Sequence, residues 1–138
     1  MRALVQRVSG ASVSVGGEEL AAIGPGLVVL LGITHGDGPA EADRIAAKVR
    51  ALRVFPDAGG RMNEPLGDRA VLCVSQFTLY GDARRGNRPA YVAAAPPEQA
   101  EPLYERVCAA LGAARGRFGA HMAVALVNDG PVTLLLEV

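Results

Sequence analysis

The sequence predicts a sheet-rich α/β fold in a single domain that covers residues 1–138. Strand-length segments surround only two segments with helical spacing, in the order β-β-β-β-α-β-β-α-β-β. Half of the residues are hydrophobic, but only 4% are aromatic and none is Trp, so the core must consist of Val, Leu, Ile and Ala side chains. Because two helices cannot cover both faces of so many strands, we expect a second sheet or a partner subunit to cover the rest.

The first third of the chain is predicted to be β structure. Met1–Val8 has the pattern of a strand rather than of a signal peptide, and Ala11–Val15 alternates apolar and polar residues as a half-buried strand does. A Gly-Gly pair then turns the chain into a strand over Glu18–Ile23. Leu27–Ile33 is an apolar run, which predicts a central strand that is covered on both faces.

The middle of the chain begins with a predicted helix. From Ala40 to Leu52 the apolar residues follow helical spacing and charged residues occupy the other side, so the helix should lie over the sheet. A short strand is expected at Val54–Phe55, and Asp57–Asp68 is expected to be a loop. Ala70–Val74 is another apolar strand, which leads directly into Ser75.

The last third of the chain is predicted to hold one helix and two strands. The helix covers Pro97–Leu111, but Pro102 cannot donate a helical hydrogen bond, so we expect the regular helix to begin only there. The strands are His121–Asp129 and Val132–Val138, and the Gly130-Pro131 step between them predicts a hairpin turn.

The charge balance argues against indiscriminate binding of nucleic acid. Lys and Arg number 14, Asp and Glu number 14, and the net charge is zero. A local basic patch is still compatible with this balance, because the polar loop Gly81–Pro89 carries Arg84, Arg85 and Arg88. Two interpretations stay open for this loop: a solvated surface, or a contact for an anionic substrate such as an RNA end.

Cysteine usage and hydropathy predict a cytoplasmic protein that has no membrane partner. No apolar run is long enough to cross a bilayer. Cys73 and Cys108 lie in apolar settings and lack the spacing of metal or redox motifs, so buried, reduced thiols are expected.

Hydroxyl groups at the end of a buried strand are the first candidates for chemistry. Ser75, Thr78 and Tyr80 lie there, but a hydroxyl nucleophile normally needs an adjacent base. The two histidines, His35 and His121, lie outside this motif, which disfavours a Ser-His-Asp triad. No metal-ligand spacing and no phosphate-binding loop occurs, so we expect neither a metal nor a cofactor. Backbone groups, hydroxyls or the substrate itself must then do the chemistry.

Short motifs follow one another over almost the whole chain. They are Met1–Val8, Gly24–Leu27, Leu31–Asp37, Leu52–Asp57, Ser75–Tyr80, Arg88-Pro89, Gly116–Ala120 and Asn128–Thr133. In this order they resemble the bacterial D-aminoacyl-tRNA deacylases. The resemblance implies two packed β layers with two helices on one side (α/β/β). It also implies a homodimer that hydrolyses the ester between a D-amino acid and the terminal adenosine of tRNA, and that removes glycine from mischarged alanine tRNA.

The resemblance gives the Asn128–Thr133 segment a role beyond that of a turn. In similar enzymes the bond before Pro131 is cis, and the pair reaches into the partner subunit's site. The two backbone carbonyls there meet the amino group of the bound ester and leave no room for an L side chain, a discrimination by steric exclusion. Arg7 matches the residue that supports this motif. The substrate-binding residues implied are Asn128, Gly130, Pro131, Val132 and Thr133.

The same resemblance assigns the catalytic wall. Ser75 and Gln76 would surround the scissile ester, and the backbone N–H groups of Phe77 and Thr78 would stabilise the oxyanion. Two further residues match the pocket for the terminal nucleotide: Phe118 and Met122. Thr78 has no evident base, so we expect the ribose hydroxyl beside the ester to assist hydrolysis.

The chain departs from the family pattern at a few positions. Gly81 replaces a common Ala, His121 replaces a frequent acidic residue, and the segments Asn63–Arg69 and Gly112–Arg115 are short. These departures affect loop contacts and tRNA preference rather than the two main motifs. The alternative from a different class is a non-catalytic module that binds aminoacyl-tRNA or RNA ends, although binding alone needs no oxyanion wall.

Overall fold

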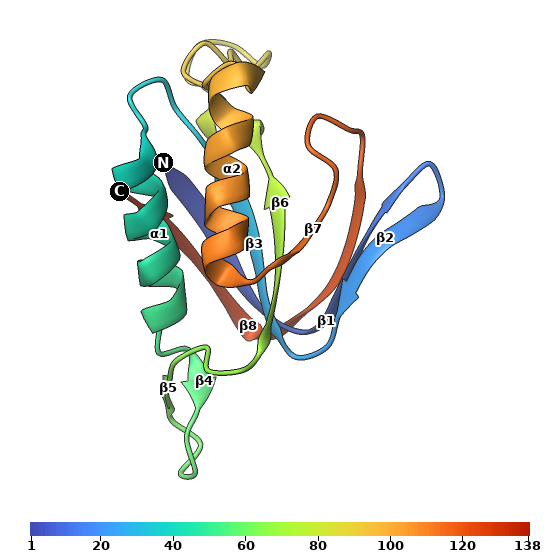
Figure 1. Cartoon of the computed structure of the whole chain (residues 1–138), viewed down its shortest axis with the longest axis vertical. Coiled ribbons are helices and arrows are strands. Elements are labelled where there is room, and N and C mark those ends of the chain that lie inside the picture. Colours follow the sequence, from blue (N-terminus) through green and yellow to red (C-terminus); the bar gives the residue numbers. More distant parts are fainter.

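One bent sheet forms the frame of the protein in a computed structural model that describes residues 1–138. Two of its strands, β1 (Arg2–Val15) and β8 (Ala123–Glu137), are long and pair antiparallel along almost their whole length. The first half of β1 also pairs with β3 (Gly26–Gly32), and its second half pairs with β2 (Glu18–Ile23). On its other side β3 pairs in parallel with β6 (Ala70–Ser75), and β6 pairs in parallel with β7 (Ala114–Arg115) at the edge of the sheet. Figure 1 shows that β1 and β8 bend together, so that one sheet supplies two layers.

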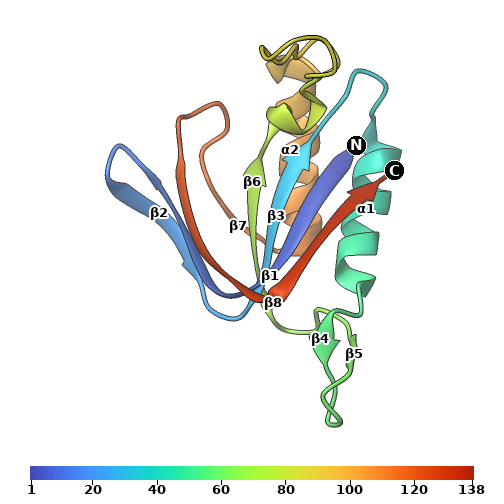
Figure 2. The same cartoon turned by 180° about the vertical axis from the view of Figure 1, so that it is seen from behind.

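Two helices cover one face of this sheet. They are α1 (Pro39–Ala51) and α2 (Pro97–Leu111), which pack side by side over β3, β6 and the first half of β1 (Figures 1 and 2). The predicted α/β/β arrangement is therefore confirmed. Its second β layer is the curled half of the same sheet rather than a separate one.

The bend creates two hydrophobic cores. Alternate strand residues such as Leu27 and Val29 face the helices and join the larger core. Their neighbours Val28 and Leu72 face the space inside the bent sheet, where they meet residues of β2 and β8. Because β3 and β6 are buried on both faces, their sequences are apolar without alternation, as predicted.

The structure corrects four expectations about elements. The separate strands expected on either side of Ser9-Gly10 are one strand, β1, and the region expected to be a loop contains β5 (Met62–Glu64), which pairs with β4 (Phe55–Pro56). Helix α2 begins at Pro97 and runs through Pro102. Pro102 and Glu98 are both exposed, so the Glu98 carbonyl that loses its helical donor can bind water instead.

The fourth correction concerns Gly130-Pro131, where no hairpin forms. Strand β8 continues past this step and stays paired with β1 on both sides of it, from Val8↔Asn128 to Gln6↔Thr133. Four residues of β8 therefore lie opposite Arg7 alone, which makes a wide bulge at the bend of the sheet. No helix of the chain is both long and apolar enough to cross a membrane.

Candidate functional site

The end of β6 places the Ser75–Thr78 motif. Ser75 is the last residue of the strand and lies opposite Leu31 of β3. The Gln76 N–H donates to the Leu31 carbonyl at 2.8 Å, after which the chain forms the short 3₁₀ helix η1 (Phe77–Tyr80). The Gln76 side-chain amide donates to the Thr78 hydroxyl. The first N–H groups of a helix have no partner inside it, so those of Phe77 and Thr78 point out of the start of η1.

Contacts beneath η1 hold this helix in place. Tyr80 is buried, and the Arg2 guanidinium lies 4.6 Å from the centre of its ring. Arg2 also donates to the Leu79 carbonyl at 2.9 Å. Burial raises the pKa of Tyr80 to about 12, so its phenol stays neutral.

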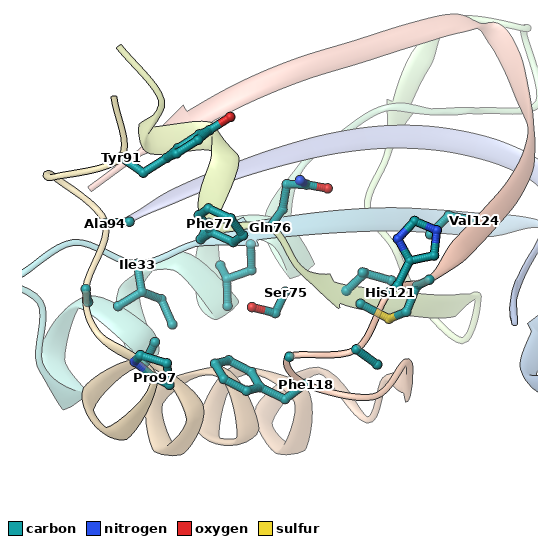
Figure 3. Close-up of a pocket in the computed structure, with 17 residues that line it drawn as sticks. Ile33, Ser75, Gln76, Phe77, Tyr91, Ala94, Pro97, Phe118, His121 and Val124 are labelled. Carbon is teal, nitrogen blue, oxygen red and sulfur yellow. The ribbon is translucent and has the colours of Figure 1, made fainter. Parts of the chain in front are cut away.

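A cavity of about 560 Å³ opens beside the end of β6, and 12 of its 17 lining residues are hydrophobic. Figure 3 shows its walls: Ser75, Gln76 and Phe77 on one side, Pro97 and Phe118 on the opposite side along α2, and His121 with Val124 at one end. The floor at Phe118 is supported by buried Tyr104, whose ring centre lies 5.8 Å from that of Phe118. A cavity of this size and character suits a small ligand with a flat apolar part.

The structure brings five of the predicted site residues together at this cavity. They are Ser75, Gln76, Phe77, Phe118 and Met122. Thr78 follows directly and is joined to Gln76 by the side-chain hydrogen bond. No carboxylate, Lys, Arg or Cys lines the cavity, and its ionisable side chains are those of Tyr91 and His121. Any reaction here must therefore rely on backbone N–H groups, neutral polar side chains, the imidazole or the ligand.

The other predicted residues lie at the bulge of β8, not at the cavity. Arg7 donates through Nε to the Asp129 carbonyl at 3.1 Å and through Nη1 to the Val54 carbonyl, and it pairs with the Asp129 carboxylate at 3.4 Å. Asn128 accepts a hydrogen bond from the Val132 N–H at 3.2 Å and donates to the Thr133 hydroxyl at 2.9 Å.

The tip of the bulge is exposed. Gly130 has φ +130°, the bond between Gly130 and Pro131 is cis, and both residues lie at the surface. A Cβ on Gly130 would lie 2.8 Å from the Val132 side chain and 3.0 Å from the Arg7 guanidinium. The bulge is thus supported from beneath by Arg7, and its surface consists of backbone, the Pro131 ring and the Asp129 carboxylate.

The bulge and the cavity are far apart within one chain. The bulge lies opposite Arg7, which is in register with Leu27 of β3 and Val71 of β6. Ser75 lies four residues further along β6, and three strand spacings separate β8 from β6. Strand rise and spacing put the two groups about 20 Å apart. A single chain therefore does not bring the two predicted halves of the site together.

Several lining residues were not singled out from the sequence. Tyr91 packs against Phe77 edge to face, with ring centres 5.1 Å apart, and the exposed His121 also lines the cavity. The other ten lining residues are small or apolar, and they include Ile33, Ala94, Ala95, Pro97 and Ala100. An aromatic residue two positions after the arginine-rich loop was the available signal for Tyr91. His35 lies outside the cavity lining, and its Nε2 is 2.7 Å from the Val92 carbonyl.

Comparisons with known proteins place almost the whole chain in one protein family. The family model described as D-Tyr-tRNA(Tyr) deacylase matches residues 4–137. The D-aminoacyl-tRNA deacylase of Symbiobacterium thermophilum is 57% identical in sequence, over 99% of this chain and 95% of that protein. The D-aminoacyl-tRNA deacylase of Halalkalibacterium halodurans is 51% identical, over 99% of both chains. A solved structure described as a c-Myc DNA unwinding element binding protein is 43% identical, with a TM-score of 0.94 over 100% of this chain and 99% of that one. A probable eukaryotic D-amino acid tRNA deacylase shares the fold, with a TM-score of 0.78 over 99% of this chain and 98% of that one, at 15% identity.

Proposed function

The chain belongs to the D-Tyr-tRNA(Tyr) deacylase family, and we propose that it hydrolyses the ester bond of D-aminoacyl-tRNA in the cavity at the end of β6. The observation that carries this proposal is the meeting of Ser75, Gln76 and Phe77 with Phe118 and Met122 around one apolar cavity. The terminal adenosine fits between Phe118 and the β6 end, and the aminoacyl ester then lies against Ser75 and Gln76. Because its substrate takes part in translation, we place the enzyme in the cytoplasm.

Hydrolysis in this cavity needs no ionised side chain. Water attacks the ester carbonyl carbon, and the oxyanion receives hydrogen bonds from the Phe77 and Thr78 N–H groups at the start of η1. Losing one such donor costs about 2.7–4 kcal/mol of transition-state stabilisation. The intermediate then expels the ribose oxygen, which takes up a proton, and free amino acid and tRNA are released.

The neighbouring ribose hydroxyl is the group we assign to assist this step. Thr78 lacks a base, and the Gln76 amide already donates to its hydroxyl, so Gln76 positions Thr78 rather than removing its proton. Thr78→Val should therefore retain most of the activity. A substrate that ends in 2′-deoxyadenosine should be slow, and full activity on it would refute this assignment.

In this proposal the bulge at Gly130-Pro131 discriminates between D- and L-aminoacyl esters. The bulge that acts at a given cavity belongs to a second copy of the chain. Three exposed apolar residues of β8, Val127, Leu134 and Leu135, lie on the strand that carries the bulge, and the free edge of β8 has no partner strand within the chain. A homodimer that covers this surface could carry the bulge of one subunit to the cavity of the other. Glycine has no side chain to exclude, so we expect glycine mischarged on alanine tRNA to be removed as well.

The direct test measures ester loss from D-Tyr-tRNA, L-Tyr-tRNA and Gly-tRNA. We expect hydrolysis of the D and glycyl substrates and protection of the L substrate. Binding without ester loss would favour the alternative, a module that binds RNA ends. The 43% identical structure is described as a binding protein for a DNA element. A DNA oligonucleotide of the same length as the tRNA is therefore a useful control.

A mixed dimer tests whether the bulge acts across subunits. One chain carries Gln76→Ala, which removes a side chain that lies against the ester and is used once its homodimer has been found inactive. The other chain carries Gly130→Ala, whose new Cβ would clash within the bulge. In the mixed dimer the active cavity belongs to the Gly130→Ala chain. If its bulge comes from the other subunit, rejection of L-Tyr-tRNA is restored. If the bulge acts within one chain, the mixed dimer stays as unselective as the Gly130→Ala homodimer.

A further inference from the structure

The arginine-rich loop projects from the mouth of the cavity. Its base is fixed by two backbone hydrogen bonds between Asp82 and Ala90, at 2.8 and 2.9 Å. Directly beyond this base lie Gly81 and Tyr91, and Tyr91 lines the cavity. A Cβ on Gly81 would lie only 2.9 Å from the Tyr91 ring, so the two residues pack closely. Figure 1 shows the loop beyond the start of α2, at the same end of the molecule as η1.

The charge of this loop is positive in a chain whose net charge is zero. Arg84 forms two hydrogen bonds with the Asp82 carboxylate, at 2.9 and 2.7 Å. This pairing lowers the pKa of Asp82 to about 2, so the two charges offset each other at neutral pH. Arg85 and Arg88 are exposed and make no ion pair, so two positive charges remain available beside the cavity.

An exposed aromatic pair lies between these arginines and the cavity. The side chains of Phe77 and Tyr91 are 55% and 40% exposed and meet edge to face. The backbone around Tyr91 is held firmly, because the Tyr91 carbonyl accepts from the Ala94 N–H at 3.0 Å and the Ala95 N–H donates to Ile33 at 2.9 Å. The ring thus stands on a well-held backbone segment, packs against Phe77 and leaves its outer part open to a ligand.

We propose that Tyr91, Arg85 and Arg88 bind the single-stranded RNA segment immediately 5′ of the terminal nucleotide. The inference rests on the proposed function, because it takes the terminal adenosine to occupy the cavity. A base upstream of it stacks on Tyr91, and the phosphates that follow contact the two arginines. Proteins bind single-stranded RNA through this combination of aromatic surfaces and basic side chains.

The salt dependence of binding tests the arginines. Each phosphate contact to a single strand contributes about 0.7 to the slope of log affinity against log salt, so Arg85→Gln with Arg88→Gln should lower the slope by about 1.4. KM for D-Tyr-tRNA should rise in both proteins between 50 and 200 mM salt. The factor by which it rises should be about seven times smaller in the variant than in the parent. The matched control is Lys48→Gln with Arg61→Gln, which removes two exposed, unpaired charges on α1 and at the β4–β5 end of the molecule.

A short substrate separates this inference from the proposed function. D-tyrosyl-adenosine lacks upstream nucleotides, so the Arg85→Gln, Arg88→Gln variant should hydrolyse it as the parent does. If the parent hydrolyses neither substrate, the proposed function fails. If the parent hydrolyses both and the variant keeps the parent's salt slope, only the subsite is refuted. An equal loss on both substrates also overturns it, because the arginines would then act at the cavity.

Stacking on Tyr91 is tested with RNA that carries no amino acid. Loss of one base stack costs about 1–3 kcal/mol, which corresponds to about 5- to 150-fold in affinity. The ligand is an ACCA oligonucleotide that carries a fluorescent label at its 5′ end and none at its 3′ end. Its affinity, measured by fluorescence anisotropy, should weaken within this range for Tyr91→Leu. Tyr91→Phe keeps the ring and should bind as the parent does. Equal affinities of the Leu and Phe variants would refute the stacking role.

Discussion

The support of the β8 bulge by Arg7 can be tested with Arg7→Lys. The guanidinium contacts two carbonyls on different segments, Asp129 of the bulge and Val54 before β4, and its side chain is only 12% exposed. Lysine carries a single ammonium group and cannot reproduce this fork, so at least one contact is lost. The variant keeps the charge, which isolates the geometry of the guanidinium from its electrostatics.

The expected loss of stability follows from these contacts. A hydrogen bond from a charged group contributes about 1.5–3 kcal/mol, and the ion pair with the half-exposed Asp129 carboxylate adds less than about 1 kcal/mol. We therefore expect Arg7→Lys to lower the free energy of unfolding by about 2 kcal/mol. For a chain of this length that corresponds to a fall in Tm of about 8 °C.

Urea unfolding at one fixed protein concentration measures this loss, since dimerisation would make stability depend on concentration. Arg61→Lys is the matched control, because Arg61 is exposed in the β4–β5 hairpin, and its side chain contacts neither segment. A loss below about 0.5 kcal/mol for Arg7→Lys would be within the range of ordinary surface substitutions and would refute the reasoning. If the bulge selects the hand, the variant should also hydrolyse L-Tyr-tRNA faster than the parent.

Three further outcomes follow from the packing and the buried phenol. Gly26→Ala should lower the free energy of unfolding, measured in urea, by more than about 3 kcal/mol, because the new Cβ would lie 1.9 Å from a backbone carbonyl of β6. The control Gly24→Ala places its Cβ where no atom lies within 4 Å, so the free energy of unfolding should change by less than about 0.5 kcal/mol. Gly81→Ala should displace the Tyr91 ring and raise KM for D-Tyr-tRNA severalfold, with little change in Tm. The pKa of Tyr80 is raised from its usual value near 10 to about 12, so its contribution to stability is full below pH 10 and is lost as the pH rises through 12. Tyr80→Phe should flatten the fall in urea midpoint between those two pH values.

The strands and helices could be predicted because their patterns are local. Leu27–Ile33 and Ala70–Val74 are apolar runs, and the structure makes both central strands buried on two faces. The limits of α1 and the end of α2 were predicted within a residue or two for the same reason. The start of α2 was misjudged at Pro102 because the cost of a helical proline depends on whether the freed carbonyl can reach water, which sequence spacing does not tell.

The candidate site was only partly predictable. Ser75, Gln76 and Phe77 are adjacent in the sequence, so their motif was visible directly. Tyr91 and His121 reach the same cavity from other segments, and that meeting depends on how the chain returns over β6. The outcome for the Asn128–Thr133 motif was hidden as well, since a Gly-Pro step between apolar runs also fits an ordinary hairpin.

The sequence by itself determined the class of fold and predicted the Ser75–Thr78 motif at the end of a buried strand, because apolar periodicity and short motifs are local features of the chain. Only the tertiary structure decided that β8 passes through Gly130-Pro131 without turning back, because Arg7 and Asn128 satisfy the polar groups of a four-residue bulge. It also decided that this bulge and the cavity lie on separate parts of one chain. The distance between them follows from the register of four strands, which is a property of the packed sheet and of no single segment.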